Sequence, residues 1–496
     1  ASTIDGDLTV RSGNASGITD SGTVTVGGNL AATTDANNGL INLGTLAVDG
    51  TVQLTTNGSG NATVVNDAGL TFAASTVGGN LAATATTGNM TDSGALTIAG
   101  TSSFTTSANN ADITLNNTNA FTGAVALNTT GSTGHATIDN GTTAFNVAAS
   151  SVGGNLNLTS GNSITDSGTV TVGGYLRATT DANNGAINLN QLAVGSSYGT
   201  IYLTTNGSGN ATVVNDRSLE LRDASVGGNL AATATTGNIS DIGTLTVSGT
   251  SSFTTSANNA YIVLNNANAL TGAVSFNTTG SSGYALVDNG TTALNVGASS
   301  VGGNLTLTSG NASGITDSGT VTVGGNLVAT TDANNGTINL GTLAVDGTVA
   351  LTTNGSGNAT IVNDAGLTFA ASTVGGNLAA TATTGNMTDS GALAITGTTT
   401  LTTNANNATI ALDTTTNAFT GAVTITTNDN SGTDADVTID GGTTALVLAA
   451  STIDGDLTVR SGNASGITDS GTLTVGGNLA ATTDANNGLI NLGTLA

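Results

Sequence analysis

The chain of 496 residues contains no proline, cysteine or tryptophan, and all five of its basic residues are arginine, so lysine is also absent. Without cysteine, neither disulfides nor thiolate metal sites can form. Without proline, every residue keeps a backbone N–H donor, as continuous strand pairing requires. Aromatic residues make up only 3% of the chain. Any core must therefore be narrow and filled by small aliphatic side chains.

Charge is also scarce and one-sided. Only 7% of residues are charged, and five arginines against 30 acidic residues give a formal net charge of −25. Such a surface excludes nucleic acid as a natural partner. Apolar residues make up 37% of the chain and alternate regularly, which argues against disorder. No stretch has the length and apolarity of a membrane helix, so we expect no membrane span in this segment.

What the chain has in abundance is repetition. Residues 1–47 return at 450–496 with a single substitution, and looser copies of the same block begin at Ala149 and Ala298. Self-similarity on this scale is typical of an elongated array of coils. It predicts one continuous β-solenoid over residues 1–496, with super-repeats 1–148, 149–297 and 298–449 and a partial fourth copy, 450–496. Because the last copy stops within a unit, we expect a segment of a longer protein.

A short tag, Val-Gly-Gly-Asn-Leu, marks the coils within each super-repeat. Successive tags lie 20 to 22, 51 to 54 or 75 to 79 residues apart, spacings that we interpret as one, two and three coils. Apolar residues alternate between tags, as at Leu8 and Val10, and Gly and Asn clusters separate these stretches. The sequence therefore predicts an all-β fold, a parallel β-helix of about 20 coils of roughly 20–26 residues with three short strands each, six coils to a super-repeat.

Two segments carry a resemblance to a known family. The stretches GNLAATTDANNGLINLGTLAVDGTV (28–52) and ITDSGTVTVGGNL (18–30) resemble the shaft repeats of filamentous haemagglutinin-type giant adhesins, the passengers of two-partner secretion. The resemblance implies a right-handed β-helical shaft exported through an outer-membrane pore. The family's amino-terminal secretion domain, with its Asn-Pro motifs, has no counterpart in this proline-free chain.

From the repeats and the resemblance we expect a non-enzymatic structural shaft of a large repetitive adhesin, which mediates attachment or cell–cell contact. The expected location is extracellular or the outer surface of a Gram-negative-type bacterium. The expected partners are further copies of the chain, or surface proteins and glycans of cells. Alternatives are a self-assembling extracellular fibre or sheath subunit, a polysaccharide-active β-helix enzyme, and ice binding by rows of threonine.

The acidic residues give no catalytic site and no firm cofactor site. The densest acidic stretch holds Asp429, Asp434, Asp436 and Asp440, but only the position of Asp440 keeps its carboxylate in the other copies, as a turn residue would. Asp434 and Asp436 are weak calcium candidates, with a solvated loop as the alternative. The aspartates of the recurring Thr-Asp-Ser-Gly turns are expected to cap their own turns. His135, the only histidine, is expected at the surface without a metal.

The sharpest departure from the repeat lies in the second copy. Tyrosine and arginine replace small residues there, and three residues are inserted, so that several large side chains fall about one coil apart. Exposed tyrosine and arginine are the types that anchor protein and glycan contacts. This predicts a contact patch; the alternative is sequence drift, with Arg222 pairing with Asp223 or Glu220. The patch residues are Tyr175, Arg177, Tyr198, Tyr202, Arg217 and Arg222, with Glu220 among them.

Overall fold

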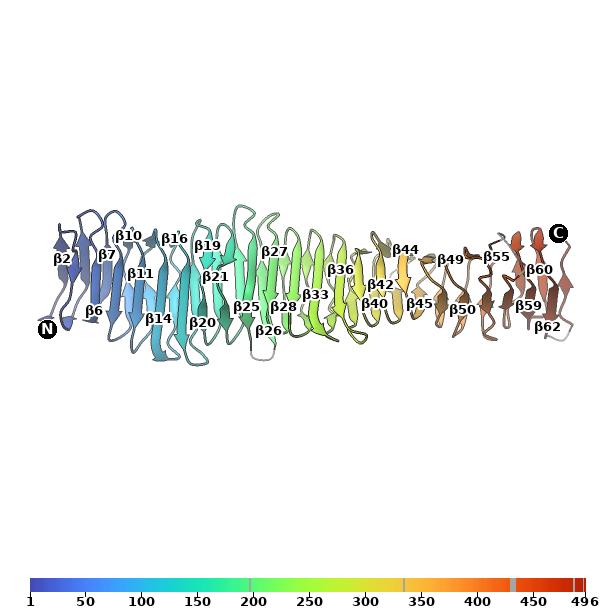
Figure 1. The fold of residues 1–496 in the computed structure, drawn as a ribbon, viewed down its shortest axis with the longest axis horizontal. Helices are drawn as coiled ribbons and strands as arrows, with labels where there is room; N and C mark the ends of the chain where they lie inside the picture. Colours follow the sequence, from blue (N-terminus) through green and yellow to red (C-terminus); the bar gives the residue numbers. More distant parts are fainter. Residues whose placement is uncertain (196–197, 333–334, 429–433, 485–486, 494) are drawn as a thin grey trace. The chain divides into compact units, whose positions relative to one another are not determined.

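The computed structural model describes residues 1–195, 198–332, 335–428, 434–484, 487–493 and 495–496 (Figure 1). By their internal contacts these residues form two compact units, Ala1–Gly249 and Thr250–Ala496, and each is a parallel β-solenoid by itself. All elements among the described residues are β-strands. Accordingly, the described part of the chain has no helix that could cross a membrane. The division into super-repeats stays a prediction of the sequence.

In each unit the chain passes alternately through two sheets, sheet 1 and sheet 2. In the first unit, sheet 1 contains β1 (Ser2–Ile4), β3 (Ile18–Thr19), β4 (Val24–Val26), β6 (Ile41–Val48), β8 (Ala62–Asn66), β11 (Leu81–Ala85), β14 (Ser102–Asn109), β17 (Val125–Thr130), β19 (Phe145–Val147), β20 (Ser150–Val152), β22 (Ile164–Asp166), β23 (Val170–Val172), β25 (Ile187–Val194), β27 (Ala211–Asn215) and β30 (Leu230–Ala234). Its sheet 2 contains β2 (Leu8–Ser12), β5 (Leu30–Thr34), β7 (Thr51–Thr55), β9 (Leu70–Phe72), β10 (Ser75–Val77), β12 (Met90–Asp92), β13 (Leu96–Ile98), β15 (Ile113–Leu115), β16 (Ala120–Phe121), β18 (Ala136–Asp139), β21 (Leu156–Ser160), β24 (Leu176–Thr180), β26 (Gly199–Thr204), β28 (Leu219–Arg222), β29 (Ser225–Val226), β31 (Ile239–Ile242) and β32 (Thr246–Val247).

The second unit has the same organisation. Its sheet 1 contains β33 (Ser251–Asn258), β36 (Val274–Thr279), β38 (Leu294–Val296), β39 (Ser299–Val301), β41 (Ile315–Asp317), β42 (Val321–Val323), β44 (Ile338–Val345), β46 (Ala359–Asn363), β49 (Leu378–Ala382), β52 (Thr399–Thr403), β55 (Val423–Thr426), β57 (Leu446–Leu448), β58 (Ser451–Ile453), β60 (Ile467–Asp469), β61 (Leu473–Val475) and β63 (Ile490–Asn491). Its sheet 2 contains β34 (Ile262–Leu264), β35 (Ala269–Leu270), β37 (Ala285–Asp288), β40 (Leu305–Ser309), β43 (Leu327–Thr331), β45 (Thr348–Thr353), β47 (Leu367–Phe369), β48 (Ser372–Val374), β50 (Met387–Asp389), β51 (Leu393–Ile395), β53 (Ile410–Leu412), β54 (Ala418–Phe419), β56 (Val437–Asp440), β59 (Leu457–Ser461) and β62 (Leu479–Thr483).

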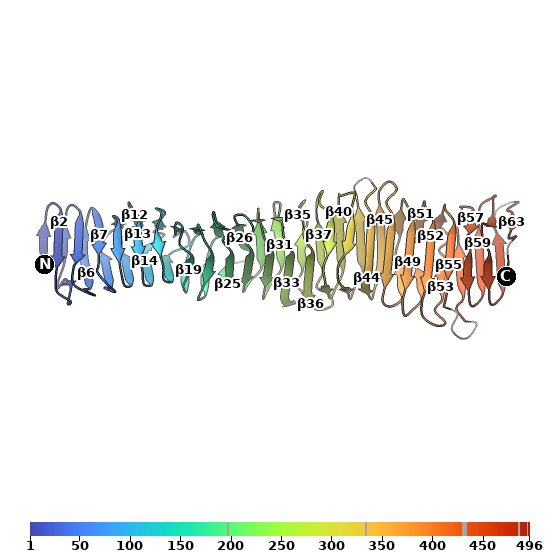
Figure 2. The same cartoon turned by 90° about the horizontal axis from the view of Figure 1, so that it is seen from above.

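Successive coils pair in parallel and in register. In the first unit, Leu156 lies beside Leu176 one coil later, and Leu176 lies beside Ile201. Within the first unit, coloured blue to green in Figure 1, the strands lie side by side in coil order. Within the second unit, coloured green to red in Figure 2, they do so as well. The described part of the chain makes about 22 turns. The prediction of an all-β parallel β-helix of about 20 coils is thereby confirmed.

The core of each coil is a thin layer of inward-facing side chains. Buried residues alternate along most short strands, as in β21, where Leu156, Leu158 and Ser160 are buried and the residues between them are half-buried. The eight phenylalanines are all fully buried, whereas the five tyrosines face outward to different degrees. The few aromatics are therefore sorted by polarity: Phe fills the interior, and Tyr keeps its hydroxyl near water.

The repeating structural unit is a module of seven passes through the two sheets. The module that begins at β8 runs β8, β9/β10, β11, β12/β13, β14, β15/β16 and β17, alternating an unbroken strand in sheet 1 with a strand pair in sheet 2. The next module begins at β18 with the sheets exchanged, because seven passes are three and a half turns. Modules begin at β8, β18 and β27 in the first unit and at β37, β46 and β56 in the second.

This half-turn offset corrects one part of the sequence interpretation. The tag at Val26 lies in sheet 1, that at Val77 in sheet 2, and that at Val152 again in sheet 1. The spacings of 51 and 75 residues between these tags therefore correspond to two and a half and three and a half turns, not to two and three. Consistent with this, the strands leading from Leu8 to Leu156 pass through seven coils, where the spacing had suggested six.

A buried asparagine satisfies the backbone where the sheets exchange roles. Only part of β6 is covered by the shorter strand β8, so the end of β6 lacks a strand partner in the next coil. The side chain of Asn66, 1% exposed, fills this place: Val48 N–H donates to Asn66 Oδ1 at 2.8 Å, and Asn66 Nδ2 donates to Val48 O at 3.1 Å and Gly69 O at 2.6 Å. Equivalent amides are Asn140, Asn215, Asn289 and Asn363.

The tag itself forms a tight corner. Its asparagine links coils through the side chain, since Asn80 N–H donates to Asn61 Oδ1 at 2.8 Å and Thr101 N–H donates to Asn80 Oδ1 at 2.8 Å. Its first glycine lies directly over the backbone of the preceding coil: a Cβ on Gly153 would stand 1.6 Å from Gly131 O. The tag is therefore explained by backbone proximity and by one side-chain ladder.

We predict that Asn66→Ala destabilises the coils around β6 and β8 by about 3 kcal/mol, because it leaves a buried N–H and C=O of Val48 unpaired. Hydrogen exchange of peptides covering β6 and β8, followed through a denaturant series, measures the change. The matched control is Asn57→Ala, whose exposed amide makes one hydrogen bond, to Asp35 O. Equal effects of the two variants would contradict the assigned role.

We also predict that Gly153→Ala destabilises its coil by about 2 kcal/mol or more, because the added methyl group would overlap Gly131 O. Gly44→Ala is the control, since nothing lies within 4 Å of a Cβ at that position. Thermal unfolding of the two variants, followed by the strand signal in circular dichroism, should separate them. Similar midpoints would show that the corner relaxes freely.

Candidate functional site

Two arginines and two tyrosines of the predicted patch meet on the outer face of sheet 2 in the first unit. Arg177 in β24 pairs in register with Tyr202 in β26, and its Cζ lies 4.1 Å from the centroid of the Tyr202 ring. Arg222 in β28 approaches the same ring, with its Cζ at 5.9 Å. The Tyr175 ring meets Tyr202 edge-on at 5.3 Å and 70°. The Tyr202 ring thus lies between two guanidinium groups. The electron-rich face of an aromatic ring attracts cations, which favours this arrangement.

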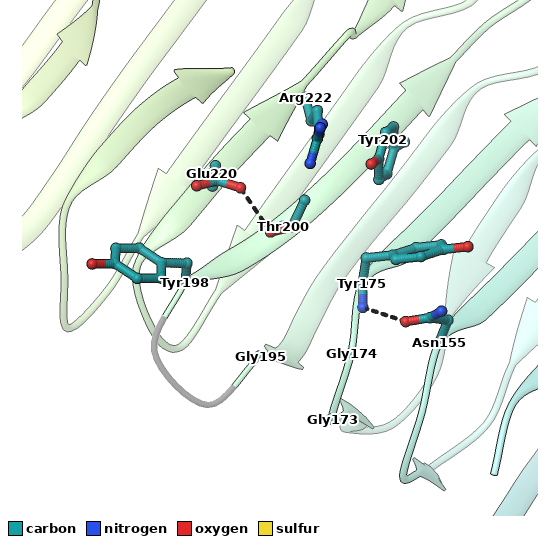
Figure 3. Close-up of a pocket in the computed structure, with 10 residues that line it drawn as sticks. All are labelled: Asn155, Gly173, Gly174, Tyr175, Gly195, Tyr198, Thr200, Tyr202, Glu220 and Arg222. Atoms are coloured by element: carbon teal, nitrogen blue, oxygen red, sulfur yellow. Dashed lines mark hydrogen bonds between the residues drawn. The ribbon is translucent and has the colours of Figure 1, made fainter. Parts of the chain in front are cut away.

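An open hollow of about 400 Å³ lies beside this cluster (Figure 3). In the view of Figure 3, Tyr175 and Tyr202 lie to one side of the Thr200–Glu220 pair and Tyr198 to the other. Thr200 Oγ1 donates a hydrogen bond to Glu220 Oε1 at 2.8 Å. Tyr198, at the corner before β26, is 70% exposed. The hollow therefore offers three phenol rings, a carboxylate and a guanidinium. It is lined by Asn155, Gly173, Gly174, Tyr175, Gly195, Tyr198, Thr200, Tyr202, Glu220 and Arg222.

The substitution at 175 and the inserted residues are structurally coupled. In the first copy, Thr51 N–H donates to the tag asparagine Asn29. The second copy has Tyr175 in place of that asparagine, so the acceptor is gone. There the corresponding donor, Thr200 N–H, bonds instead to the carbonyl of Tyr198 at 2.9 Å, within the inserted corner. The insertion thus supplies the acceptor that the Asn-to-Tyr change removes.

The structure separates Arg217 from the other patch residues. Its Nη1 donates to the carbonyl of Gly195, and its Nε lies 3.5 Å from Asp216 Oδ1. Arg217 therefore stabilises the corner before β26 and does not line the hollow. The alternative expectation paired Arg222 with Asp223 or Glu220. Within the described part of the chain, however, Arg222 forms no ion pair and faces the Tyr202 ring.

Two of the acidic candidates, Asp436 and Asp440, accept hydrogen bonds from the backbone. Asp429 lies outside the described residues. Asp434 and Asp436 are exposed and precede β56 rather than share a strand, and Asp436 Oδ1 accepts Asp456 N–H at 2.7 Å. Asp440 closes its own turn, accepting Gly442 N–H at 2.8 Å, as predicted. No group of three potential metal ligands occurs among the described residues.

The aspartates of the Thr-Asp-Ser-Gly turns act between coils, which corrects the expectation that each caps its own turn. Asp317 Oδ1 accepts Gly341 N–H at 3.0 Å, and its Oδ2 accepts Thr342 N–H at 2.7 Å and Thr342 Oγ1–H at 2.9 Å. These donors lie one coil later, in the part of β44 between its pairing with β41 and its pairing with β42. Equivalent inter-coil bonds are made by Asp20, Asp92, Asp166, Asp389 and Asp469.

His135 stands directly before the first strand of its module, in the position of Asn61 in the preceding module, and is half-buried. Its Nδ1 accepts Asn155 N–H at 2.8 Å, as an asparagine Oδ1 does elsewhere. The counterpart Tyr284 in the second unit stacks on Tyr261 at 5.1 Å, and burial, followed by the Tyr261 charge, raises the pKa of the Tyr284 phenol above its usual value. Sequence reasoning missed this tyrosine pair; the coil spacing between the two residues was the available signal.

The fold and these ladders define a repetitive parallel β-solenoid protein. The chain belongs to the family described as "Repeats of unknown function (DUF5649)", which matches residues 59–128, 133–194, 208–277, 283–340, 356–426 and 434–496. Each matched segment begins two or three residues before the first strand of a seven-pass module, so the family repeat is this module. No curated protein and no solved structure matches the chain.

We predict that Asp317→Ala destabilises the β41–β44 region by about 2 kcal/mol, since three hydrogen bonds to a charged acceptor are lost. Asp346→Ala removes the same charge from an exposed corner residue and serves as the control. Protection of the Gly341 and Thr342 amides in hydrogen exchange reports the change locally. Retained protection in Asp317→Ala would refute the inter-coil role.

Proposed function

We propose that the chain is a non-enzymatic structural shaft of an extracellular or cell-surface adhesin, and that it holds other parts of that adhesin away from the cell during attachment or cell–cell contact. The observation that carries this proposal is the uniformity of the module. The same seven passes, junction asparagines and inter-coil aspartates recur in both units. The recurring polar side chains hydrogen-bond to the chain's own backbone. Such an arrangement stabilises the solenoid and suits a mechanical role rather than a catalytic one.

Stiffness follows from the pairing scheme. Each coil hydrogen-bonds to the coils before and after it, so bending a solenoid unit strains many backbone bonds at once. The outward residues are mostly small and polar, and the net charge of −25 disfavours non-specific association. Specific contacts are therefore expected at the few places where large side chains lie on this surface. Surface proteins, glycans or further copies of the chain would bind there.

The extracellular setting is supported by the resemblance of the repeats to shafts of haemagglutinin-type adhesins and by the lack of cysteine. A protein exported through a narrow pore benefits from having no thiols that could cross-link on the way. We expect a Gram-negative-type bacterium as the source, with the chain on its outer face.

We predict that antibodies raised against residues 1–496 label the outside of intact native cells, and that cells from which the repeats are deleted attach less to surfaces or to one another. Immunogold electron microscopy with a permeabilised-cell control checks the first outcome, and an attachment assay checks the second. Label confined to the cytoplasm would contradict the proposal. Ordered filaments built from this chain alone would favour a fibre subunit, and loss of viscosity in a polysaccharide solution would favour an enzyme.

A further inference from the structure

The Tyr–Arg cluster and its hollow are the one place in the described first unit where large aromatic and cationic side chains gather on three successive coils. The same outward column in the first copy is Thr9, Ala31 and Gln53, and in the third copy Thr306, Val328 and Ala350. In the second copy it is Asn157, Arg177 and Tyr202. The second copy therefore differs on consecutive coils, where an arginine and a tyrosine replace the smaller uncharged side chains of the other copies.

The backbone around the hollow is adapted to these side chains. Thr200 N–H finds a new acceptor in Tyr198 O, and the Arg217 guanidinium holds the carbonyl of Gly195 at the base of the corner. Tyr175 N–H still donates to Asn155 Oδ1 at 3.1 Å, so the ladder is intact up to the tyrosine. The inter-coil bond that Thr51 N–H makes to Asn29 in the first copy is lost here, but Thr200 N–H keeps a partner in Tyr198 O, so the backbone beneath the large side chains stays hydrogen-bonded. A support that is already ordered lowers the entropic cost of binding.

The surroundings of the hollow are less acidic than the chain as a whole. The lining holds one guanidinium, Arg222, and one carboxylate, Glu220, and Arg177 adds a second guanidinium on the neighbouring coil, against the Tyr202 ring, whereas the chain as a whole carries −25. The two guanidinium groups therefore suit an anionic ligand. A guanidinium binds a carboxylate through two parallel hydrogen bonds.

The size and lining of the hollow indicate the rest of the ligand. At about 400 Å³ it has the volume of a small-ligand site. Tyr175, Tyr198 and Tyr202 present apolar ring surface, and Thr200 and Glu220 present hydroxyl and carboxylate oxygens. Sugar rings combine an apolar C–H face with a rim of hydroxyl donors, and a carboxylate acceptor beside aromatic rings complements both.

We propose that this hollow binds an acidic saccharide: a sugar unit whose carboxylate faces Arg222 and Arg177, whose C–H face lies on the tyrosine rings, and whose hydroxyls donate to Glu220. The assignment names the ligand class of the predicted contact patch and rests on the proposed surface role for its biological setting. A protein partner is disfavoured, because a stable protein contact covers roughly 800 Å² on each side, whereas the large side chains are confined to three coils bordered by glycines such as Gly173 and Gly174.

The test uses the purified chain of residues 1–496 and isothermal titration with tri-galacturonate, with neutral tri-galactose as the uncharged probe. We expect the acidic trisaccharide to bind at least tenfold more tightly than the neutral one. Tyr198→Thr combined with Tyr202→Thr should weaken binding of both at least tenfold. Arg222→Gln should abolish the preference for the acidic probe. Arg460→Gln, which removes an equal charge from an exposed arginine near Asp484, should leave binding unchanged.

Equal affinity for the two probes, no binding of either, or a loss in Arg460→Gln as large as in Arg222→Gln would overturn the assignment. Patch variants that alter only sedimentation, and not sugar binding, would show a chain–chain contact and overturn it as well. Circular dichroism of each variant confirms that the solenoid is intact. Because the titration is done in solution, its failure leaves the surface labelling of native cells unaffected, so the two proposals fail independently.

Discussion

The backbone hydrogen bond from one coil to the next is the interaction on which the rest of this structure depends. A coil cannot bury or satisfy its own backbone, so every N–H and C=O must find a partner in a neighbouring coil or on a side chain. Where strands cover one another fully, the parallel ladder is sufficient. Where the unbroken strand and the strand pair exchange sheets, it is not, and Asn66 and its equivalents replace the missing strand with an amide. Where β44 passes from β41 to β42, the Asp317 carboxylate replaces a missing carbonyl.

This constraint explains the unusual composition better than any catalytic need. Asparagine carries both a donor and an acceptor on a short side chain, so it imitates a peptide group at a junction or continues a ladder at a corner. Glycine occurs where the chain passes directly over the preceding backbone, as at Gly153. Proline would remove a donor that the ladder needs. Because these side chains are committed to the backbone, we propose recognition only at departures from the repeat, such as the Tyr202 cluster.

Much of this architecture could be predicted from alternation and spacing. The strands, their parallel stacking and the turn role of Asp440 follow from local patterns, and the patch residues could be grouped because they recur at coil intervals. The half-turn offset could not be predicted, since 51 residues divide as readily into two long coils as into two and a half shorter ones. Likewise, Asn66 looks like an ordinary turn residue, and the partner of Asp317 lies 24 to 25 residues away, where local capping rules do not reach. The contact of Arg177 with Tyr202 needed the register between coils.

Disulfide mapping in this cysteine-free chain tests the coil register most directly. Thr55 in β7 lies beside Thr76 in β10, and Thr51, in the same strand, lies beside Thr71 instead. Neighbouring parallel strands are about 4.8 Å apart, within disulfide range, whereas four residues along a strand span roughly 13 Å. The account predicts rapid oxidation of the Thr55→Cys/Thr76→Cys pair and none of the Thr51→Cys/Thr76→Cys pair. The reverse outcome, which coils of about 25 residues in whole turns would give, would contradict it.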